Sequence, residues 1–296
     1  MTRPLVLLTG ATGQVGWELA RTLAPIARVA APGSGELDLG SADALRDAVR
    51  TLAPAAIVNA AAYTAVDRAE SEPERAEAVN AAAPAVLARE AARLGALMVQ
   101  ISTDYVFDGE ADAPYAEDAP VNPLSVYGRT KLAGEAGVAA AGGPHLVFRT
   151  SWVYGARGAN FMRTMLRLAR EREELRVVDD QHGAPTWSRM LAQGVAAVLG
   201  GALRGGRFEV PPEHWGVHHL SAGGQTTWHG FARALLEADP ARAEQRCRAV
   251  VAIPTSQFPT PARRPRYSVL DGTRAARAFG VALPEWREQL ALCLAP

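Results

Sequence analysis

The amino-acid sequence predicts an α/β protein built on a doubly wound parallel sheet, with a smaller C-terminal lobe of α+β structure. Three observations predict it. In the first half, short apolar runs alternate with helical patterns of about 10 residues or more, which is typical of βαβ units. A glycine-rich turn directly follows the first apolar run, where such folds place one. The alternation stops near residue 150 of 296, so the remainder is expected to form a second lobe.

The elements of the first half are expected in strict alternation. The strands are Leu5–Thr9, Arg28–Ala31, Ala56–Asn59, Leu97–Ser102 and Leu146–Thr150. The helices are Gln14–Leu23, Ala42–Leu52, the alanine-rich segment Pro73–Leu94, and Tyr127–Ala140. Because helices connect parallel strands, we expect them on both faces of the sheet.

The second half has a less regular pattern, which suits a smaller lobe. Helices are expected at Phe161–Glu171, Met190–Leu199, Thr273–Phe279 and Glu285–Leu294. Proline-bearing loops are expected at Gly183–Thr186 and at 254–265. The boundary is soft, because strands of the second half can return to the main sheet.

Composition excludes several classes of protein. The 31 basic and 31 acidic side chains cancel, so the chain has no overall positive charge for nucleic acid or for anionic lipid, and we expect neither partner. Two cysteines, Cys247 and Cys293, are too few for a disulfide framework and fit a reducing compartment. The N-terminal apolar run is shorter than a signal-peptide core, and no apolar stretch approaches about 18 residues. We therefore expect a cytoplasmic protein.

The turn Gly10-Ala11-Thr12-Gly13-Gln14-Val15-Gly16 lies between the first predicted strand and the first predicted helix. Its glycines permit a tight turn and a close approach of the backbone to a pyrophosphate, which the N–H groups of the following helix can bind. The alternative is a tight turn with no ligand. We expect a Rossmann-like dinucleotide site that includes Gly10, Thr12, Gly13, Gln14, Val15 and Gly16.

The end of the second strand gives information about cofactor choice. In NAD-binding proteins an acid there binds the ribose hydroxyls, but residues 30–34 contain no carboxylate. The missing acid permits NADPH, and no arginine there requires it, so NADH use stays open. Asp38 follows and could cap a helix or contact the adenine, with Leu39 beside it.

Tyr127 and Lys131 are four residues apart on a predicted helix, so they share one face. Lys131 is the sole lysine among 31 basic residues, which suggests that an amine is needed there for more than its charge. A nearby cation lowers the pKa of a phenol, which makes the pair suitable for acid–base chemistry. Thr103 follows the fourth strand at its carboxyl end, where ligands bind in such sheets, and could donate a hydrogen bond to a carbonyl oxygen. The alternative for Tyr127 and Lys131 is a pair of surface residues without a catalytic role, and the alternative for Thr103 is a simple cap at the strand end.

With these motifs, the chain resembles the extended short-chain dehydrogenase/reductase superfamily, and more closely its dTDP-4-dehydrorhamnose reductase family. The likeness covers nearly the whole chain. It includes Thr12–Trp17, Val58–Asp67, Ala69–Glu74, Ser102–Phe107, Val126–Glu135 and Phe148–Tyr154. It also includes Asp180–Thr186, Gly223–His229 and Val251–Pro265, which are not generic to the superfamily and make the resemblance specific.

The resemblance implies an enzyme of dTDP-L-rhamnose synthesis that reduces the C4 ketone of dTDP-4-dehydro-L-rhamnose with NAD(P)H. It implies that Tyr127 protonates the developing alkoxide and that Thr103 binds the sugar oxygen. It further implies that Lys131 holds the nicotinamide ribose and lowers the pKa of the phenol. NADPH is the expected cofactor, with NADH also accepted.

The resemblance also implies the binding contacts. Asp104, Trp152 and Asn160 are the expected contacts of the sugar nucleotide, and Arg264 suits its diphosphate because a guanidinium fork matches that geometry. The segment Ala62-Tyr63-Thr64 is expected beside the cofactor. Residues 1–150 would then form the dinucleotide-binding domain, and residues 151–296 mainly the substrate-binding lobe, with some segments returning to the first domain.

Metal sites are not expected. Some relatives dimerise around Mg²⁺ held by glutamates, but the matching positions are Glu18, Arg189 and Arg287, and guanidinium groups cannot bind a hard cation. The histidines at 214, 218 and 219 have no nearby cysteine or paired carboxylate to complete a metal site. We expect a monomer, or a homodimer formed through another surface.

Two alternative functions stay open. One is a nucleotide-sugar epimerase or dehydratase of the same superfamily, although related 4,6-dehydratases place an Asp-Glu pair after the threonine, and here Asp104 is followed by Tyr105. The other is a non-catalytic regulatory subunit that binds NADP. The segments around Trp152 and Arg264 argue against the second alternative.

Overall fold

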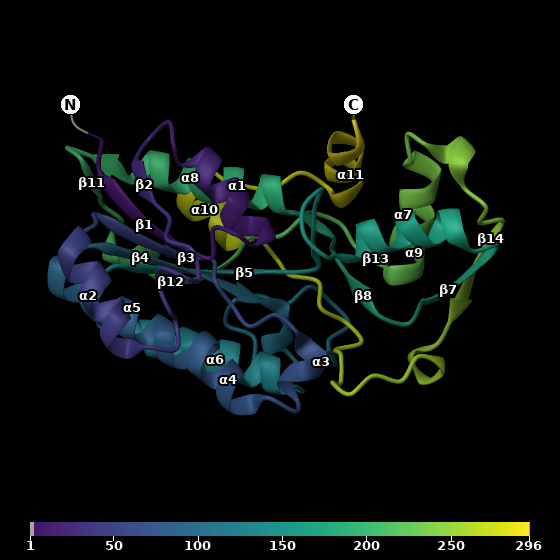
Figure 1. Cartoon of the computed structure of the whole chain (residues 1–296), viewed down its shortest axis with the longest axis horizontal. Coiled ribbons are helices and arrows are strands. Elements are labelled where there is room, and N and C mark those ends of the chain that lie inside the picture. Colours follow the sequence, from purple (N-terminus) through teal and green to yellow (C-terminus); the bar gives the residue numbers. More distant parts are fainter. Residues whose placement is uncertain (1–2, 296) are drawn as a thin grey trace.

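A computed structural model of the chain describes residues 3–295, and its centre is a six-stranded sheet. The strand order is β12-β5-β4-β3-β1-β2, and every pair in it is parallel. The strands are β1 (Leu5–Thr9), β2 (Arg28–Ala30), β3 (Ala56–Asn59), β4 (Leu97–Thr103), β5 (His145–Thr150) and β12 (Gly216–His219). The predicted doubly wound α/β fold is confirmed (Figure 1).

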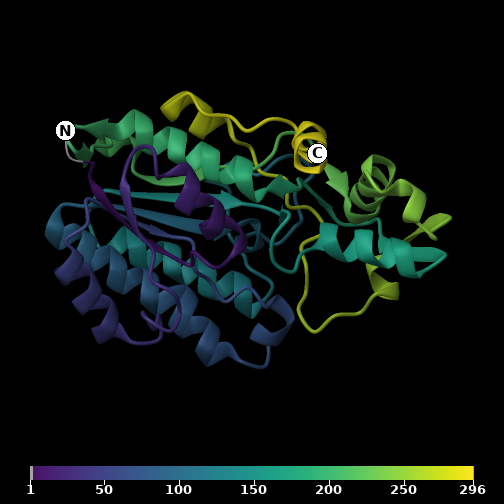
Figure 2. The same ribbon diagram turned by 45° about the horizontal axis from the view of Figure 1, so that its top comes forward.

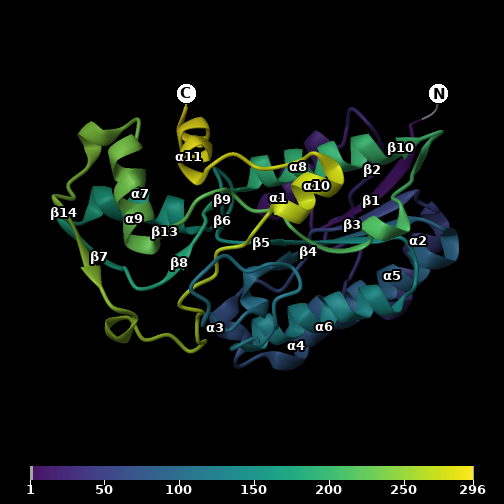
Figure 3. The same ribbon diagram turned by 180° about the vertical axis from the view of Figure 1, so that it is seen from behind.

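Helices cover both faces of this sheet, as Figures 1 and 3 show from opposite sides. One layer holds α2 (Ala42–Leu52), α5 (Ala83–Leu94) and α6 (Val126–Ala140), and the other holds α1 (Gln14–Thr22), α8 (Ser188–Ala202) and α10 (Thr273–Phe279). Successive strand residues enter opposite cores: Leu7 and Ile57 pack against α2 and α5, whereas Val6 and Leu8 pack against α1 and α8. This alternation is the period of two expected of a strand buried on both sides.

The second half divides between this domain and a smaller lobe. Helix α8 packs along α1, and β12 pairs with β5, so both complete the first domain. The smaller lobe contains α7 (Phe161–Glu171), α9 (Trp228–Ala238), α11 (Trp286–Leu294), and the parallel pair β7 (Glu174–Val178) and β14 (Ala249–Ile253). Its core is a separate cluster centred on Phe231, Leu235 and Trp286. Figure 2 shows the lobe beside the carboxyl ends of the sheet.

Short elements connect these parts. They are α3 (Val66–Ala69), α4 (Pro73–Glu77), β6 (Val153–Tyr154), β8 (His182–Gly183), β9 (Thr186–Trp187), β10 (Leu203–Arg204), β11 (Arg207–Phe208) and β13 (Thr226–Thr227). The 3-10 helices are Asp104–Val106, Pro212–His214, Arg242–Glu244 and Thr255–Gln257. Within residues 3–295, no helix combines the length and apolar character needed to cross a membrane.

The long helix expected at Pro73–Leu94 is wrong as a single element. It begins as α4, passes through a π-helical turn at Ala78–Ala82 and continues as α5. Pro84 has no N–H to donate to the carbonyl of Asn80, so the regular hydrogen-bond ladder is interrupted there. The released carbonyl lies against α6, where a Cβ on Gly134 would come within 2.1 Å of it.

Candidate active site

The turn between β1 and α1 needs glycine at two positions. Gly10 has a φ of +77°, and a Cβ on it would lie 2.5 Å from the backbone nitrogen of Ala61. A Cβ on Gly16 would lie 2.1 Å from the carbonyl oxygen of Gly10. Gly13 is exposed and caps α1, whose first turn has no side-chain cap and no acidic residue. The N–H groups at this helix end are therefore free to bind an anion such as a pyrophosphate.

The loop after β2 contains a carboxylate that the sequence analysis did not assign to it. Glu36 turns back, and its carboxylate accepts a hydrogen bond from the backbone N–H of Gly33 (2.7 Å). Asp38 is exposed and accepts from the N–H of Gly40 (2.8 Å), while Leu39 packs at the edge of the core near α2. Ser41, not Asp38, caps α2 by accepting from the N–H of Ala44 (3.2 Å).

A row of buried polar side chains crosses the carboxyl ends of three neighbouring strands. Thr9 on β1 donates to Asn59 on β3 (2.5 Å), and Asn59 donates to Gln100 on β4 (2.8 Å). Gln100 in turn donates to the carbonyl oxygen of Ile101 (2.8 Å), which also accepts from the ammonium of Lys131 (2.6 Å). The row links the glycine-rich turn to Lys131 on α6.

Local contacts fix the start of α6 beside the end of β4. The Ser125 hydroxyl caps the helix by accepting from the N–H of Gly128 (3.1 Å), and Glu70 accepts from the N–H of Val126 (2.8 Å). A Cβ on Gly128 would lie 2.2 Å from the carbonyl oxygen of Tyr105, so only glycine permits this approach. Close packing here brings Tyr127 next to the strand end that carries Thr103.

Asn80 is a positioning residue that the sequence analysis missed. Its amide side chain accepts from the N–H of Tyr63 (2.8 Å) and donates to the hydroxyl of Thr130 on α6 (3.1 Å). It thereby ties the segment after β3 to the helix that carries Tyr127. The Tyr63 phenol donates to Glu72 (2.7 Å), and Tyr63 packs with Tyr127 against one small apolar cluster. The sequence did contain a signal for Asn80, because it is a polar amide within an otherwise alanine-rich helical segment.

Tyr127, Thr103 and Asp104 lie together at the end of β4. Burial raises the pKa of the Tyr127 phenol to about 12, and the adjacent Thr103 hydroxyl partly opposes this shift. Burial also raises the pKa of Asp104 to about 6, although the Thr103 hydroxyl donates to its carboxylate (3.0 Å). The other carboxylate oxygen of Asp104 is buried with no hydrogen-bond partner. The Tyr127 phenol therefore keeps its proton at neutral pH.

The expected lowering of the Tyr127 pKa by Lys131 stays a prediction, because the net shift of the phenol in this structure is upward. The ammonium is directed to the carbonyl of Ile101, and desolvation of the phenol is the larger effect. Burial lowers the pKa of Lys131 itself to about 8, and the carboxylate of Glu135 opposes that shift. At pH 7 the amine is still mostly protonated.

Trp152 has a strained backbone and a stacked side chain. Its φ is +47°, which is rare for a residue with a bulky side chain. Its indole stacks on Trp228, with ring centroids 3.6 Å apart and planes within 5°. A Cβ on Gly183 would lie 2.4 Å from the same indole, so β8 also needs glycine. Residues held in rare backbone conformations are often found at ligand sites.

Arg264 lies close to Tyr105, which follows β4. Its guanidinium donates to both carboxylate oxygens of Asp67 (3.1 and 2.8 Å) and to the hydroxyl of Thr260. This bond ties the 254–265 loop to α3. Burial and the Asp104 carboxylate raise the pKa of Tyr105. The guanidinium of Arg264 opposes this shift, which it can do because it lies close to Tyr105 at the end of β4.

Asn160 connects the smaller lobe to the glycine-rich turn. Its carboxamide oxygen accepts from the N–H of Arg163 as the cap of α7 (3.1 Å). Its amide nitrogen donates to Gln14 (2.9 Å) and to the carbonyl of Gly155 (2.8 Å). Asn160 therefore uses its hydrogen bonds to hold the two parts of the protein together rather than pointing freely into the site.

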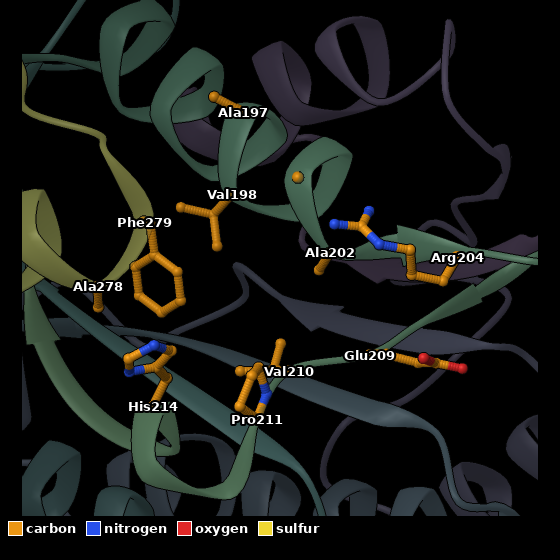
Figure 4. Close-up of a pocket in the computed structure, with 11 residues that line it drawn as sticks. Ala197, Val198, Ala202, Arg204, Glu209, Val210, Pro211, His214, Ala278 and Phe279 are labelled. Atoms are coloured by element: carbon orange, nitrogen blue, oxygen red, sulfur yellow. The ribbon is translucent and has the colours of Figure 1, made fainter.

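The remaining candidates are not brought into this site. In residues 3–295 no group of three or more potential metal ligands gathers, and Arg189 forms an ion pair with Glu18 (3.2 Å). His218 and His219 are buried on β12, and burial lowers the pKa of His219 to about 3. A cavity of about 570 Å³ lies behind this sheet edge, between Val198 of α8 and Phe279 of α10 (Figure 4). It shares no residue with the site at Tyr127.

Comparison with known proteins agrees with this geometry. The family model described as RmlD substrate binding domain matches residues 4–296. The dTDP-4-dehydrorhamnose reductase of Burkholderia thailandensis is 50% identical over 295 residues, covering 98% of this chain and 97% of its own. A solved dTDP-4-dehydrorhamnose reductase from Clostridium acetobutylicum has a TM-score of 0.89 at 36% identity, over 98% of each chain. One from Bacillus anthracis in complex with NADP has a TM-score of 0.88 at 32% identity, over 99% of each chain. The chain therefore belongs to the dTDP-4-dehydrorhamnose reductase family.

Proposed function

We propose that the protein reduces the C4 ketone of dTDP-4-dehydro-L-rhamnose to dTDP-L-rhamnose, with NADPH as the hydride donor and NADH as an accepted substitute. The observation that carries this proposal is the half-buried phenol of Tyr127 beside Thr103 and on the same helix face as Lys131. Family membership supports the substrate class.

The residues present fit a dinucleotide cofactor. The uncapped N-terminus of α1 suits its pyrophosphate, and the exposed Gly13 leaves space for it to approach the backbone. When bound, the nicotinamide supplies the hydride. Because Glu36 places a carboxylate at the loop after β2, we infer that NADH is used as well as NADPH.

Tyr127 serves as the proton donor in this proposal. A phenol with a pKa near 12 carries its proton at pH 7 and can release it only to a stronger base, such as the alkoxide that develops at C4. Thr103 orients the sugar oxygen, and Lys131 provides a positive charge that stabilises the phenolate left behind. Positioned proton transfer of this kind contributes about 10²–10⁴-fold to the rate.

We assign the sugar-nucleotide side to Asp104, Trp152 and Arg264. Asp104 has a buried oxygen without a partner, and Arg264 lies close to Tyr105, the residue after Asp104. Asn160 would act indirectly on substrate binding, by holding the start of α7 to Gln14 of the glycine-rich turn. We further propose that any dimer forms without a metal, because the Glu18 carboxylate is bound by Arg189.

An epimerase or dehydratase is less well supported. The position after Asp104 carries Tyr105, whose ring packs edge-on against Tyr127 with centroids 5.5 Å apart. A phenol with a raised pKa cannot replace the glutamate that a dehydratase uses there.

The test is NADPH oxidation with dTDP-4-dehydro-L-rhamnose in the presence of EDTA, for the wild type and Tyr127→Phe. We expect rapid oxidation by the wild type and a loss of about 10²–10⁴-fold in kcat in the variant, with NADPH binding retained. Tight NADPH binding without oxidation by the wild type would refute the reductase and favour the regulatory alternative.

A further inference from the structure

A buried ion pair lies directly behind the candidate active site and has no role in the chemistry described so far. The guanidinium of Arg149 on β5 donates to both carboxylate oxygens of Glu135 on α6, at 3.0 Å from Nε and 2.7 Å from Nη2. The two side chains are only 4% and 5% exposed. The hydroxyl of Ser102, the residue before Thr103, donates to the same carboxylate (2.5 Å).

Three successive turns of α6 hold three successive residues of β4. Tyr127 lies beside Thr103, Lys131 donates to the carbonyl of Ile101, and Glu135 accepts from the hydroxyl of Ser102. Residues four apart lie on one helix face, so Tyr127, Lys131 and Glu135 form one line along the strand end. A shift of α6 along β4 would therefore disturb the Glu135 and Lys131 contacts together with the position of the phenol.

We propose that Glu135 is a positioning residue of the reductase: held by Arg149, its carboxylate ties the end of β4 to the helix face of Tyr127 and Lys131, and it supplies the negative charge opposite Lys131. This inference rests on the proposed function for its effect on turnover. Its structural part, the placement and charge of Lys131, stands independently of which substrate is reduced.

Few other charges can act on the Lys131 ammonium. On the elements packed against α6, the described buried charged groups are Asp104 after β4, Arg149 on β5 and Glu90 on α5. Glu90 is bound by Arg50 of α2, and Asp67 of α3 is bound by Arg264. The charged residues of α4 (Glu74, Arg75 and Glu77) are exposed. On α6 itself, Tyr127 is neutral and Arg129 is exposed. Among the residues that the structure describes, Glu135 is accordingly the one group that raises the pKa of Lys131 against burial.

The chain provides a direct readout, because Lys131 is its sole lysine. In protein labelled with ¹³C-lysine, a single side-chain resonance reports the titration of this amine without any substrate. We expect a midpoint near pH 8 in the wild type and a lower midpoint in Glu135→Gln. The same variant should lose about 10²-fold in kcat, since a displacement of about 1 Å at a reacting group has that effect. The alkaline limb of kcat/KM for NADPH should move to lower pH.

Two further variants separate positioning from stability. Glu90→Gln breaks another bidentate pair away from the site, Arg50–Glu90, in which the arginine is 49% exposed. This variant should lower the Tm while leaving kcat and the lysine titration unchanged. Glu135→Gln combined with Arg149→Met removes both buried charges, so the Tm should recover relative to Glu135→Gln alone while kcat stays low.

Recovery of kcat together with the Tm in the double variant would overturn the proposal, as would a lysine midpoint unchanged by Glu135→Gln. Suppose that the lysine titrations of the wild type and of Glu135→Gln are as expected, but the wild type does not turn over the sugar nucleotide. That result would refute the proposed function and still support the placement of Lys131.

Discussion

The glycine-rich turn offers a sharp test, because two of its glycines are required for different reasons. Gly16 is required by the fold itself, since a Cβ there would lie 2.1 Å from the carbonyl oxygen and 2.6 Å from the carbonyl carbon of Gly10. Gly13 has an ordinary extended backbone and is exposed, and its nearest atom would be 3.3 Å from a Cβ. If the turn binds a pyrophosphate, alanine at 13 would occupy the space of that ligand.

The magnitudes follow from these distances. In Gly16→Ala the clash is more than 1 Å short of ordinary van der Waals contact and involves backbone on both sides, so a cost of about 3 kcal/mol is expected. With an unfolding entropy of about 2.1 cal/mol/K per residue, that corresponds to a Tm lower by roughly 5 °C for this chain. Gly13→Ala should change the Tm by less than about 2 °C, yet weaken NADPH binding by at least about 10-fold, or roughly 1.4 kcal/mol.

The assays are thermal unfolding for the Tm and fluorescence titration for the Kd of NADPH, on the same preparations of both variants. A Gly13→Ala variant that binds NADPH as tightly as the wild type would refute the pyrophosphate interpretation and leave only a tight turn. A Gly16→Ala variant with an unchanged Tm would show that α1 can move away from the turn without cost.

Two further predictions concern the opposite side of the site. Asp67→Asn should raise the KM for the sugar nucleotide about fivefold with kcat unchanged, because it removes the charge that orients Arg264. Since the Asp67 side chain is 40% exposed, the loss of binding free energy is limited to about 1 kcal/mol. An unchanged KM would exclude Arg264 from substrate binding. Asp104→Asn should stabilise the protein at pH 7 but not at pH 4. The raised pKa means that wild-type stability is fully present below the ordinary carboxyl pKa of about 4 and is lost as pH rises through about 6, by up to roughly 3 kcal/mol. Parallel stability curves from pH 4 to 7 would contradict the buried state of Asp104.

The periodicity of the sequence was sufficient for the main sheet and its helical layers, because burial on both faces leaves a clear apolar signal in each strand. It was insufficient for β12, where two adjacent histidines are fully buried. Their burial depends on pairing with β5 and on aromatic contacts such as that of His219 with Phe107, 5.9 Å between centroids. Helix α9 and the pair β7–β14 were also missed; α9 becomes buried only when the smaller lobe assembles, and β14, whose residues are mostly exposed, carries little apolar periodicity.

For the candidate site, local motifs located the residues but not their partners. Tyr127 and Lys131 share a helix face by spacing alone, whereas the Trp152–Trp228 stack and the Arg264–Asp67 pair join segments far apart in the sequence. The direction of the pKa shift at Tyr127 could not be inferred from spacing either. It depends on how deeply the phenol is buried and on where the ammonium of Lys131 is directed.

Burial has one consistent electrostatic consequence at the end of β4. It raises the pKa values of Asp104 and Tyr127 and lowers that of Lys131, so at pH 7 Tyr127 is neutral, whereas Asp104, with a pKa of about 6, is mostly ionised. In the proposed reduction, an alkoxide and then a phenolate add further negative charge to this low-dielectric region. A single cation is then worth more than it would be in water, provided that it stays protonated. Glu135 favours the protonated form of Lys131 and lies on the side of it remote from Thr103 and Tyr127. Because Arg149 compensates the charge of Glu135, the Lys131 cation is maintained without an added anion where the sugar would bind.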